Sequence, residues 1–333
     1  MPSLYILKAI SAIFIVFIHL PGIWIESTIL QPLMRIGVPC FLMISGYFLV
    51  VNGEIKKKNA IKQLKKTILL TIAIYGIYIL FHIIRNLLLG NPAIPDRWLN
   101  LRFLWRLLLV GDNIDSVFWY LTAYMEALII IIALTTLFSQ NITKKILAIA
   151  SPILLILAVI FNRYSGLLGL TLDIATSRNA LTVALPCLFL GASIKLYSSF
   201  YSKLNIHLKL IAILVILSYG EYLLLHKFDI NGSGADYNIL TFPLSFSIFL
   251  YCIKIPNLTI VNDKISNGLV SIGKNYSANL YLYHSLVWGI ITLTLMISGF
   301  DWFKIFMNGE SVIILIILFS YLSKKIKEKN GFK

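Results

Sequence analysis

Charged residues are scarce in this chain. Of its 333 residues only 13% are charged while 59% are hydrophobic, and the mean hydropathy is +0.86. A soluble domain is nearer half apolar and a quarter charged, so this composition excludes a soluble globular protein. The apolar residues also gather in runs of about 17–23 residues, which is the length that a helix needs to cross the hydrocarbon core of a bilayer.

These runs predict an all-α polytopic membrane protein with about ten transmembrane helices in a single bundle. The expected spans are residues 4–21, 30–51, 67–89, 117–138, 145–161, 180–197, 207–225, 238–253, 276–298 and 309–323. Their connections are short, and there is no internal repeat or low-complexity segment. We therefore expect one integral-membrane domain over residues 1–333. Its first span is expected to be a permanent helix, since Lys8 lies inside it and no small-residue cleavage site precedes Pro21.

Cysteine is rare as well. The three cysteines, Cys40, Cys187 and Cys252, fall inside apolar spans at unrelated spacings. This pattern predicts small buried side chains and excludes both a disulfide framework and a cysteine metal site. We expect no bound metal and no resident cofactor.

Acidic residues are few, and the 14 of them leave a net charge of +15. If both termini are cytoplasmic, ten spans place 19 of the 29 Lys and Arg residues inside and eight outside. The inside set includes six lysines between Lys56 and Lys66 and five between Lys324 and Lys333. Such an inside excess orients helices during insertion and attracts anionic lipid headgroups. The basic charge is therefore a topology signal and does not predict nucleic-acid binding.

Polar groups within the spans are the candidates for function, because they are costly in a bilayer. Lys8 and His19 lie 11 residues apart in the first span. Eleven residues turn a helix by about 1,100°, so both side chains and Ser11 lie on nearly one stripe, with a rise of roughly 16 Å between Lys8 and His19. The alternatives are that Lys8 only reaches toward cytoplasmic headgroups and that His19 only bonds a backbone carbonyl.

The second span begins with Arg35, at a depth comparable to His19. Gly37 and Pro39 follow it and loosen a helix, which predicts an irregular end that is buried in protein or lines a cavity. Near the other end, the small pair Ser45-Gly46 permits the close approach of another helix or of a ligand.

Two later spans also carry polar groups. Trp119, Tyr120 and Tyr124 lie near the outer boundary, where an interfacial aromatic belt is the alternative to a site. Glu126 lies deeper, and a carboxylate there needs a cation or a donor. His284 is expected in the ninth span, nearer the cytoplasm than His19. The groups at outer helix ends are interpreted as surface residues: His82, Arg85, Glu221 and His226.

Two outer connections are long enough to cover an external substrate. Residues 90–116 combine Trp98, Phe103 and Trp105 with leucines, which predicts an amphipathic helix on the outer surface. Residues 162–179 contain glycine and threonine and are expected to form a loop.

Together these residues resemble acyltransferase family 3, bacterial membrane O-acyltransferases that modify surface glycans. Residues 35–47 read RIGVPCFLMISGY, close to the family signature of Arg, Val-Pro, Phe and Ser-Gly-Tyr. The first span resembles the family's opening segment, although Lys8 stands where the family has Arg and Tyr5 where it has Asp. Three further stretches are weakly similar to family motifs and follow one another in the same order as in the family. They are residues 118–121 (FWYL), 185–191 (LPCLFLG) and 279–284 (NLYLYH).

The resemblance implies transfer of an acyl group, acetyl by family frequency, from cytoplasmic acyl-CoA to a hydroxyl of a cell-surface or lipid-linked glycan. His19 would be the general base or the acyl carrier, and Lys8 would meet the CoA phosphates. Arg35 would orient the acceptor or stabilise the oxyanion. The expected partners are acyl-CoA, a glycan and membrane lipids, and the expected location is the bacterial plasma (inner) membrane.

The remaining assignments come from the residues themselves. Glu126 would hold the His19 ring in its productive tautomer, and Trp119 and Tyr120 would stack on a sugar. Ser45 and His284 are further candidates for substrate binding. Two other classes stay open: a transporter or flippase, which would show broken helices in corresponding halves, and a non-catalytic membrane subunit.

Overall fold

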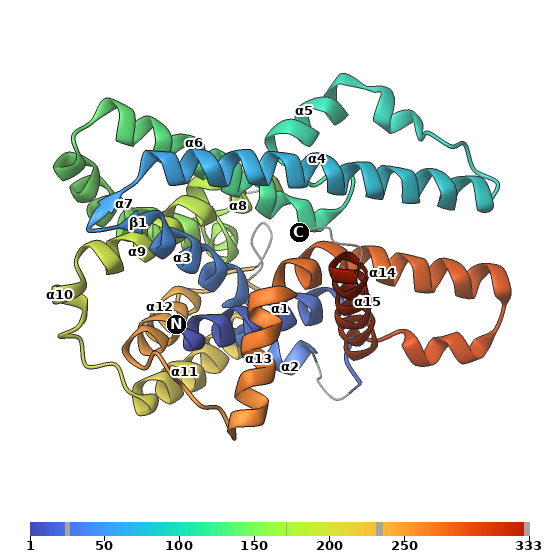
Figure 1. Cartoon of the computed structure of the whole chain (residues 1–333). Helices are drawn as coiled ribbons and strands as arrows, with labels where there is room; N and C mark the ends of the chain where they lie inside the picture. Colours follow the sequence, from blue (N-terminus) through green and yellow to red (C-terminus); the bar gives the residue numbers. More distant parts are fainter. Residues whose placement is uncertain (24–26, 171, 231–235, 330–333) are drawn as a thin grey trace. The chain divides into compact units, whose positions relative to one another are not determined.

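The fold is almost entirely helical, as the sequence predicts. The computed structural model describes residues 1–23, 27–170, 172–230 and 236–329 (Figure 1). The long helices are α1 (Pro2–His19), α3 (Gly37–Leu49), α4 (Lys57–Leu88), α6 (Trp119–Leu137), α7 (Gln140–Ile160), α9 (Leu185–Leu196), α11 (Leu208–Lys227), α12 (Thr241–Lys254), α13 (Asp263–Asn275), α14 (Ser277–Ser298) and α15 (Gly309–Lys329). The short helices are α2 (Ser27–Met34), α5 (Leu101–Leu109), α8 (Ile174–Ser177) and α10 (Ser198–Tyr201), with a π-helical turn η4 (Ala180–Ala184).

All ten expected spans coincide with helical segments. Among the described residues, eight helical segments are long and apolar enough to cross a membrane. The helix α12 is apolar but has only 14 residues. The number of crossings and the side on which the termini lie stay predictions.

The chain forms two compact units, which are described separately. One consists of Met1–Val38 and Ile255–Lys333, and the other of Pro39–Lys254. We call them the terminal unit and the central unit. The terminal unit therefore contains Lys8, His19, Arg35 and His284, and the central unit contains the other predicted site residues.

In the terminal unit, α1 lies among α2, α13, α14 and α15. Glycine permits two close approaches in this unit. A Cβ at Gly273 of α13 would overlap the backbone of Tyr5, and a Cβ at Gly309 of α15 would lie 2.7 Å from the Phe17 ring. The helix α13 was not expected, because its apolar residues Ile265, Leu269 and Ile272 form a short amphipathic face rather than a membrane-length run.

In the central unit, α3 and α9 cross backbone to backbone. A Cβ at Gly46 would overlap the carbonyl oxygen of Leu188, and a Cβ at Gly191 would overlap that of Met43. Small residues at a crossing let two membrane helices approach closely. Of the two roles open to the Ser45-Gly46 pair, the structure shows helix packing for Gly46.

Two segments that could have been single helices are broken. α2 ends at Met34 and α3 begins at Gly37, so Arg35 and Ile36 form a turn, which confirms the expected irregular end. Later, α8 ends at Ser177, and the Asn179 side chain caps the π-helical turn by accepting hydrogen bonds from the amides of Leu181 and Thr182. This second break was not expected.

A small hairpin interrupts the helices. Strands β1 (Val50–Val51) and β2 (Glu54–Ile55) pair antiparallel around Asn52-Gly53, which adopt positive φ angles of 51° and 71°. An Asn-Gly pair favours such a turn. The side-chain amide of Gln140 at the start of α7 bonds both backbone groups of Ile55, at 3.2 Å and 3.1 Å. The hairpin is thereby attached to α7.

Candidate functional site

The polar stripe of α1 lies within the terminal unit. Lys8 is half-buried, Ser11 is fully buried and His19 is exposed at the last residue of the helix. The Ser11 hydroxyl has no hydrogen-bond partner among the described residues. Buried polar groups in proteins are nearly always paired, so an unpaired hydroxyl between Lys8 and His19 is open to a ligand.

His284 of α14 contacts His19. The two ring centroids lie 5.3 Å apart, and the ring planes are inclined by 31°. His284 is fully buried, and its Nδ1 lies 3.1 Å from the carbonyl oxygen of Leu280 and 2.8 Å from that of Tyr281. The expectation that His284 lies nearer the cytoplasm than His19 is therefore wrong, because the two rings lie at the same level. In the sequence, the depth of each histidine was judged from its distance to the ends of its own expected span. That distance does not show how far α14 extends beyond the end of α1.

The turn that carries Arg35 packs against the middle of α1. A Cβ on Gly37 would lie 2.9 Å from the carbonyl oxygen of Ser11 and 3.2 Å from the Ile15 side chain. Gly37 thus lets the chain pass close to α1 between Lys8 and His19. Arg35 precedes it by two residues and is half-buried.

The segment after His19 is tied to the start of α15. The amide of Gly309 donates to the carbonyl oxygen of Pro21 at 2.7 Å. Both carboxylate oxygens of Glu310 accept from the Ile23 amide at 3.0 Å. These bonds hold the chain where it leaves α1, and so they restrict how far the end of α1 with His19 can move.

The other end of α1 lies close to basic residues of α13. Gly273 contacts the backbone of Tyr5, one turn before Lys8, and the next residue is the exposed Lys274. Lys264 lies at the opposite end of α13. The structure therefore places a second cation near the Lys8 end of the stripe.

Ser45, Trp119 and Tyr120 come together in the central unit. The Ser45 hydroxyl donates to the carbonyl oxygen of Phe41 at 3.0 Å and is within hydrogen-bonding reach of the phenols of Tyr120 and Tyr124. The rings of Tyr120 and Tyr124 stack at 6.0 Å, and Trp119 meets Tyr120 edge-on at 6.5 Å. Trp119 is 7% exposed while Tyr120 is half-buried, so Tyr120 offers more of its surface to a sugar.

Glu126 finds a donor within its own unit. Its carboxylate lies near the backbone amide of Ala180, the first residue of the π-helical turn. Amides at a helix start have no partner inside the helix, so a carboxylate there serves as a cap. His19 belongs to the other unit, and the expected contact between Glu126 and His19 stays a prediction.

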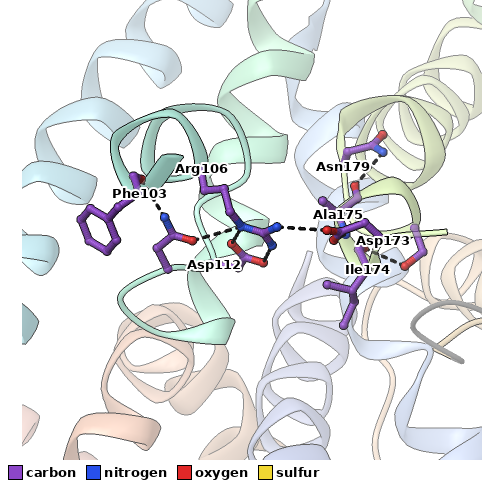
Figure 2. Close-up of polar contacts among 9 residues, drawn as sticks. Phe103, Arg106, Asp112, Asp173, Ile174, Ala175 and Asn179 are labelled. Atoms are coloured by element: carbon purple, nitrogen blue, oxygen red, sulfur yellow. Dashed lines mark hydrogen bonds and ion pairs between the residues drawn. The ribbon is translucent and has the colours of Figure 1, made fainter. Parts of the chain in front are cut away.

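Arg106 joins the two long connections, residues 90–116 and residues 162–179. The expected amphipathic helix in residues 90–116 is present as α5, with Leu101, Leu104 and Leu108 exposed along it. From α5 the Arg106 guanidinium reaches Asp112 at 3.2 Å from its Nε and Asp173 at 3.1 Å from an Nη (Figure 2).

The bonds at this junction also affect two ionisation equilibria. The amide of Ala175, which Asp173 caps, and the guanidinium of Arg106 hold the pKa of Asp173 below its usual value. The hydrogen bond with Asp112 raises the pKa of Arg106. The junction is therefore charged at neutral pH, and it fixes the ends of residues 90–116 and 162–179 to each other.

The end of α11 carries a structural carboxylate. Glu221 accepts from the phenol of Tyr164 and from the amides of Ile239 and Leu240, the latter two at 2.7 Å and 2.9 Å. These bonds tie the Glu221 carboxylate to Tyr164 and to the start of α12, and its interpretation as a surface residue stays a prediction. All three cysteines are buried and free, as expected.

Comparison with protein-family models matches an acyltransferase domain to residues 1–323. The chain belongs to acyltransferase family 3. No curated protein and no solved structure matches the sequence. The resemblance seen in the sequence is confirmed, and the protein is a membrane acyltransferase.

The structure gives physical reasons for the signature of the acyltransferase. Gly37 and Gly46 each permit a backbone approach, to α1 and α9 respectively. Pro39 is the third residue of α3, where the missing amide hydrogen costs no helical bond. Arg35 lies in the turn that the signature creates. Much of the signature thus shapes the backbone, and Arg35 is its charged group.

The contact between His19 and His284 was missed by sequence reasoning. One signal was present, because the stretch from Asn279 to His284 is similar to a family motif. That signal could not show which side chain His284 meets, since the contact depends on how α14 packs against α1. No group of three or more His, Cys, Asp or Glu residues is placed to hold a metal ion in the part of the chain that the structure describes.

Proposed function

We propose that the acyltransferase moves an acyl group, acetyl by family frequency, from cytoplasmic acyl-CoA to a hydroxyl of a cell-surface or lipid-linked glycan in the bacterial plasma membrane. The observation that carries the proposal is the stripe of α1, on which Lys8, the unpaired hydroxyl of Ser11 and the exposed His19 follow one another. On such a stripe, the cation Lys8 can bind a phosphate at one end, and His19 can act as a base at the other end.

Lys8 and Lys274 would bind the phosphates of CoA. The stripe rises roughly 16 Å from Lys8 to His19, and an extended pantetheine arm can lie along it. Ser11 would offer its hydroxyl to an amide of that arm. This arrangement carries the thioester toward His19 while the charged part of CoA stays on the cytoplasmic side.

His19 would act as the general base. The acceptor hydroxyl attacks the thioester carbonyl carbon while the imidazole takes its proton. The tetrahedral intermediate then collapses, the carbon–sulfur bond breaks, and the leaving CoA thiolate receives the proton from His19. Arg35 would stabilise the oxyanion or orient the acceptor. In the alternative chemistry His19 carries the acyl group itself.

The central unit would contribute to acceptor binding. The half-buried ring of Tyr120 would stack on a sugar, with Trp119 and Ser45 fixing its orientation. Glu126 would either hold the His19 ring or only cap Ala180. The variant Glu126→Gln separates the two roles, because Gln keeps an oxygen for the Ala180 amide but loses the charge.

A transporter would require broken helices in corresponding halves of the chain. The structure shows breaks in the second and sixth of the ten expected spans, at Arg35 and near Asn179. Two halves of five spans would pair the second span with the seventh, which is the unbroken α11. The positions of the breaks therefore favour the enzyme.

The test uses the purified protein in detergent with radiolabelled acetyl-CoA and glycan acceptor. Label that moves to the acceptor supports the proposal. In matched proteoliposomes, movement of glycan without transfer of label would show a transporter. Neither activity, in protein that still elutes as a single folded species, would show a non-catalytic subunit.

A further inference from the structure

The central unit contains a groove that is lined by α7, α9 and α12. Its volume is about 760 Å³, within the range of about 300–1,000 Å³ that is usual for ligand pockets. Ser193 of α9 and Phe242 of α12 lie at its base, since they are only 1% and 5% exposed. Ile156 and Ile239 lie at its rim, where they are 62% and 51% exposed. The groove is therefore open along one side.

The lining of the groove is mostly apolar, and two of its hydroxyl groups are engaged elsewhere. The Ser151 hydroxyl donates to the carbonyl oxygen of Pro186 at 3.0 Å, and the Tyr164 phenol donates to the Glu221 carboxylate. The helix α7 is long and apolar enough to span a membrane, so the open side of the groove faces lipid. A hydrocarbon chain that enters from the bilayer fits this lining.

The length of the groove distinguishes between two kinds of chain. Its lining extends along α7 from Ala148 to Ile160, which is about 18 Å at 1.5 Å per residue. Half of the hydrocarbon core is about 15 Å, and a phospholipid tail ends near this depth. Tyr164, beyond the end of α7, lengthens the groove further. The groove is thus longer than one phospholipid tail, whereas an isoprenoid chain can extend past the middle of the bilayer.

A cation lies beside one end of the groove. Arg163 directly precedes Tyr164 and is 8% exposed. Its Nε donates to the carbonyl oxygen of Ile230 at 3.2 Å, and its guanidinium carbon lies 5.9 Å from the centre of the Tyr222 ring. A guanidinium has five N–H donors in a fork that matches a phosphate. In the predicted orientation this end lies outside, where a lipid-linked glycan has the phosphate that joins its chain to the sugar.

We propose that the groove lined by α7, α9 and α12 holds the isoprenoid chain of a lipid-linked glycan, with the phosphate at Arg163. The inference rests on the proposed function and selects one of its two classes of acceptor. Hydrocarbon gains little free energy when it moves from lipid into an apolar groove, because lipid tails are as apolar as leucine. The shape of the groove and the phosphate contact therefore select the chain, and they keep the sugar at the outer side of the central unit.

Photocrosslinking tests the occupant directly. The full-length protein in detergent is irradiated with a long-chain polyprenyl phosphate that carries a diazirine on its chain, and the labelled peptides are identified by mass spectrometry. We expect label on the groove residues of α7, α9 and α12. An excess of unlabelled polyprenyl phosphate should remove this label, and an excess of phosphatidylglycerol should not. Equal competition by phosphatidylglycerol would show an ordinary lipid site and overturn the proposal.

Two substitutions in α7 form a matched pair. Val159→Trp fills the groove from its lining and should lower the labelling about tenfold, which corresponds to about 1.4 kcal/mol. Ile153→Trp adds the same side chain at a position that is 54% exposed and outside the lining, and its labelling should be unchanged. Size-exclusion profiles show whether each variant is folded. Normal groove labelling in folded Val159→Trp would overturn the proposal.

Arg163→Gln tests the phosphate contact. Half-maximal labelling should require a higher concentration of the polyprenyl phosphate probe, because a charge-assisted bond is lost. Labelling by the corresponding polyprenol, which has no phosphate, should be unchanged and would show that the groove is intact. An equal response to both probes would overturn the role of Arg163.

Acyl transfer separates this proposal from the proposed function. With a lipid-linked glycan as acceptor, Val159→Trp should raise the acceptor KM about tenfold and leave the KM for acetyl-CoA unchanged. The same glycan released from its lipid should be acylated equally by the wild type and by Val159→Trp. An unchanged acceptor KM in the folded variant would overturn the groove as an acceptor site and leave the proposed function standing. Groove labelling without acyl transfer by the wild type would overturn the proposed function and leave the chain-binding groove standing.

Discussion

The ammonium group of Lys8 has two candidate partners, the lipid headgroups and the phosphates of acyl-CoA. Lys8 is half-buried in the first half of α1, one turn after the contact of Tyr5 with Gly273. A lysine that only reaches the headgroups would have no reason to share a stripe with an unpaired serine and a histidine. A lysine that binds phosphate would share the task with Lys274, which follows Gly273 directly.

The donor role of Lys8 is tested by Lys8→Gln. Loss of a phosphate contact removes binding that is equal in the ground and transition states, so the KM for acyl-CoA should rise, with little change in kcat or in the acceptor KM. Lys274→Gln should show a smaller rise. Lys264→Gln is the matched control, because Lys264 lies about 15 Å further along α13 and should leave the donor KM unchanged. An unchanged donor KM in Lys8→Gln would assign Lys8 to the headgroups.

At the scale of helices, α3 and α9 of the central unit cross backbone to backbone. Both helices present a glycine where the backbones meet, and in each case the obstacle to a side chain is a backbone carbonyl. Backbone cannot rotate away as a flexible side chain can. The crossing also holds Ser45 beside Tyr120, because Ser45 precedes Gly46.

Gly46→Ala and Gly191→Ala should each destabilise the protein. The added methyl group forces the helices apart, which costs about 1–3 kcal/mol in a packed core. Gly76→Ala in α4 and Gly220→Ala in α11 are the controls, since a Cβ at either position meets nothing within 4 Å. These controls should be neutral or stabilise by about 0.5–1 kcal/mol. Thermal unfolding in detergent measures the difference, and equal melting temperatures for all four variants would refute the close crossing.

The elements that the sequence predicted share a strong local signal. Apolar length marks the spans, Gly37 and Pro39 mark the break after Arg35, and the aromatic and leucine residues mark α5. The helix α13 and the π-helical turn lack such a signal. α13 has only a short amphipathic face, and the turn at Ala180 depends on Asn179 and Glu126, which lie far apart in the sequence.

The site was predictable in part for the same reason. The stripe of α1 follows from helical geometry alone, and the structure contains the continuous helix Pro2–His19 that this geometry requires. The pairing of His19 with His284 depends on packing between helices that are more than 250 residues apart in the sequence. Periodicity within a helix carries no information on that packing.

At the scale of the whole molecule, the lysines and the length of α4 bear on orientation. This helix has 32 residues, or about 48 Å at 1.5 Å per residue, against a hydrocarbon core of about 30 Å. Its first turns hold Lys57, Lys58 and Lys62, and its later turns expose leucine and isoleucine. The helix is therefore long enough to cross and still extend its basic end into water.

This arrangement predicts cytoplasmic termini, a cytoplasmic Lys56–Lys66 segment and an external segment over residues 90–116. Alkaline phosphatase fused after Gly90 should be active, because the enzyme folds only outside the cytoplasm. The same reporter fused after Asn59 should have almost no activity. The opposite pattern would reverse the orientation and place the Lys8 end of the stripe on the outside.

The central claim is that His19 performs the chemistry, and His19→Ala tests it most directly through acetyl transfer at saturating acetyl-CoA and acceptor. A positioned base contributes about 10²–10⁴-fold, so the loss in kcat should exceed that from Trp119→Ala, Tyr120→Phe or His284→Ala. The variant should still insert, fold and bind acetyl-CoA, because His19 is exposed at the end of α1. Near-normal turnover in His19→Ala together with an inactive His284→Ala would contradict the account and assign the base to α14.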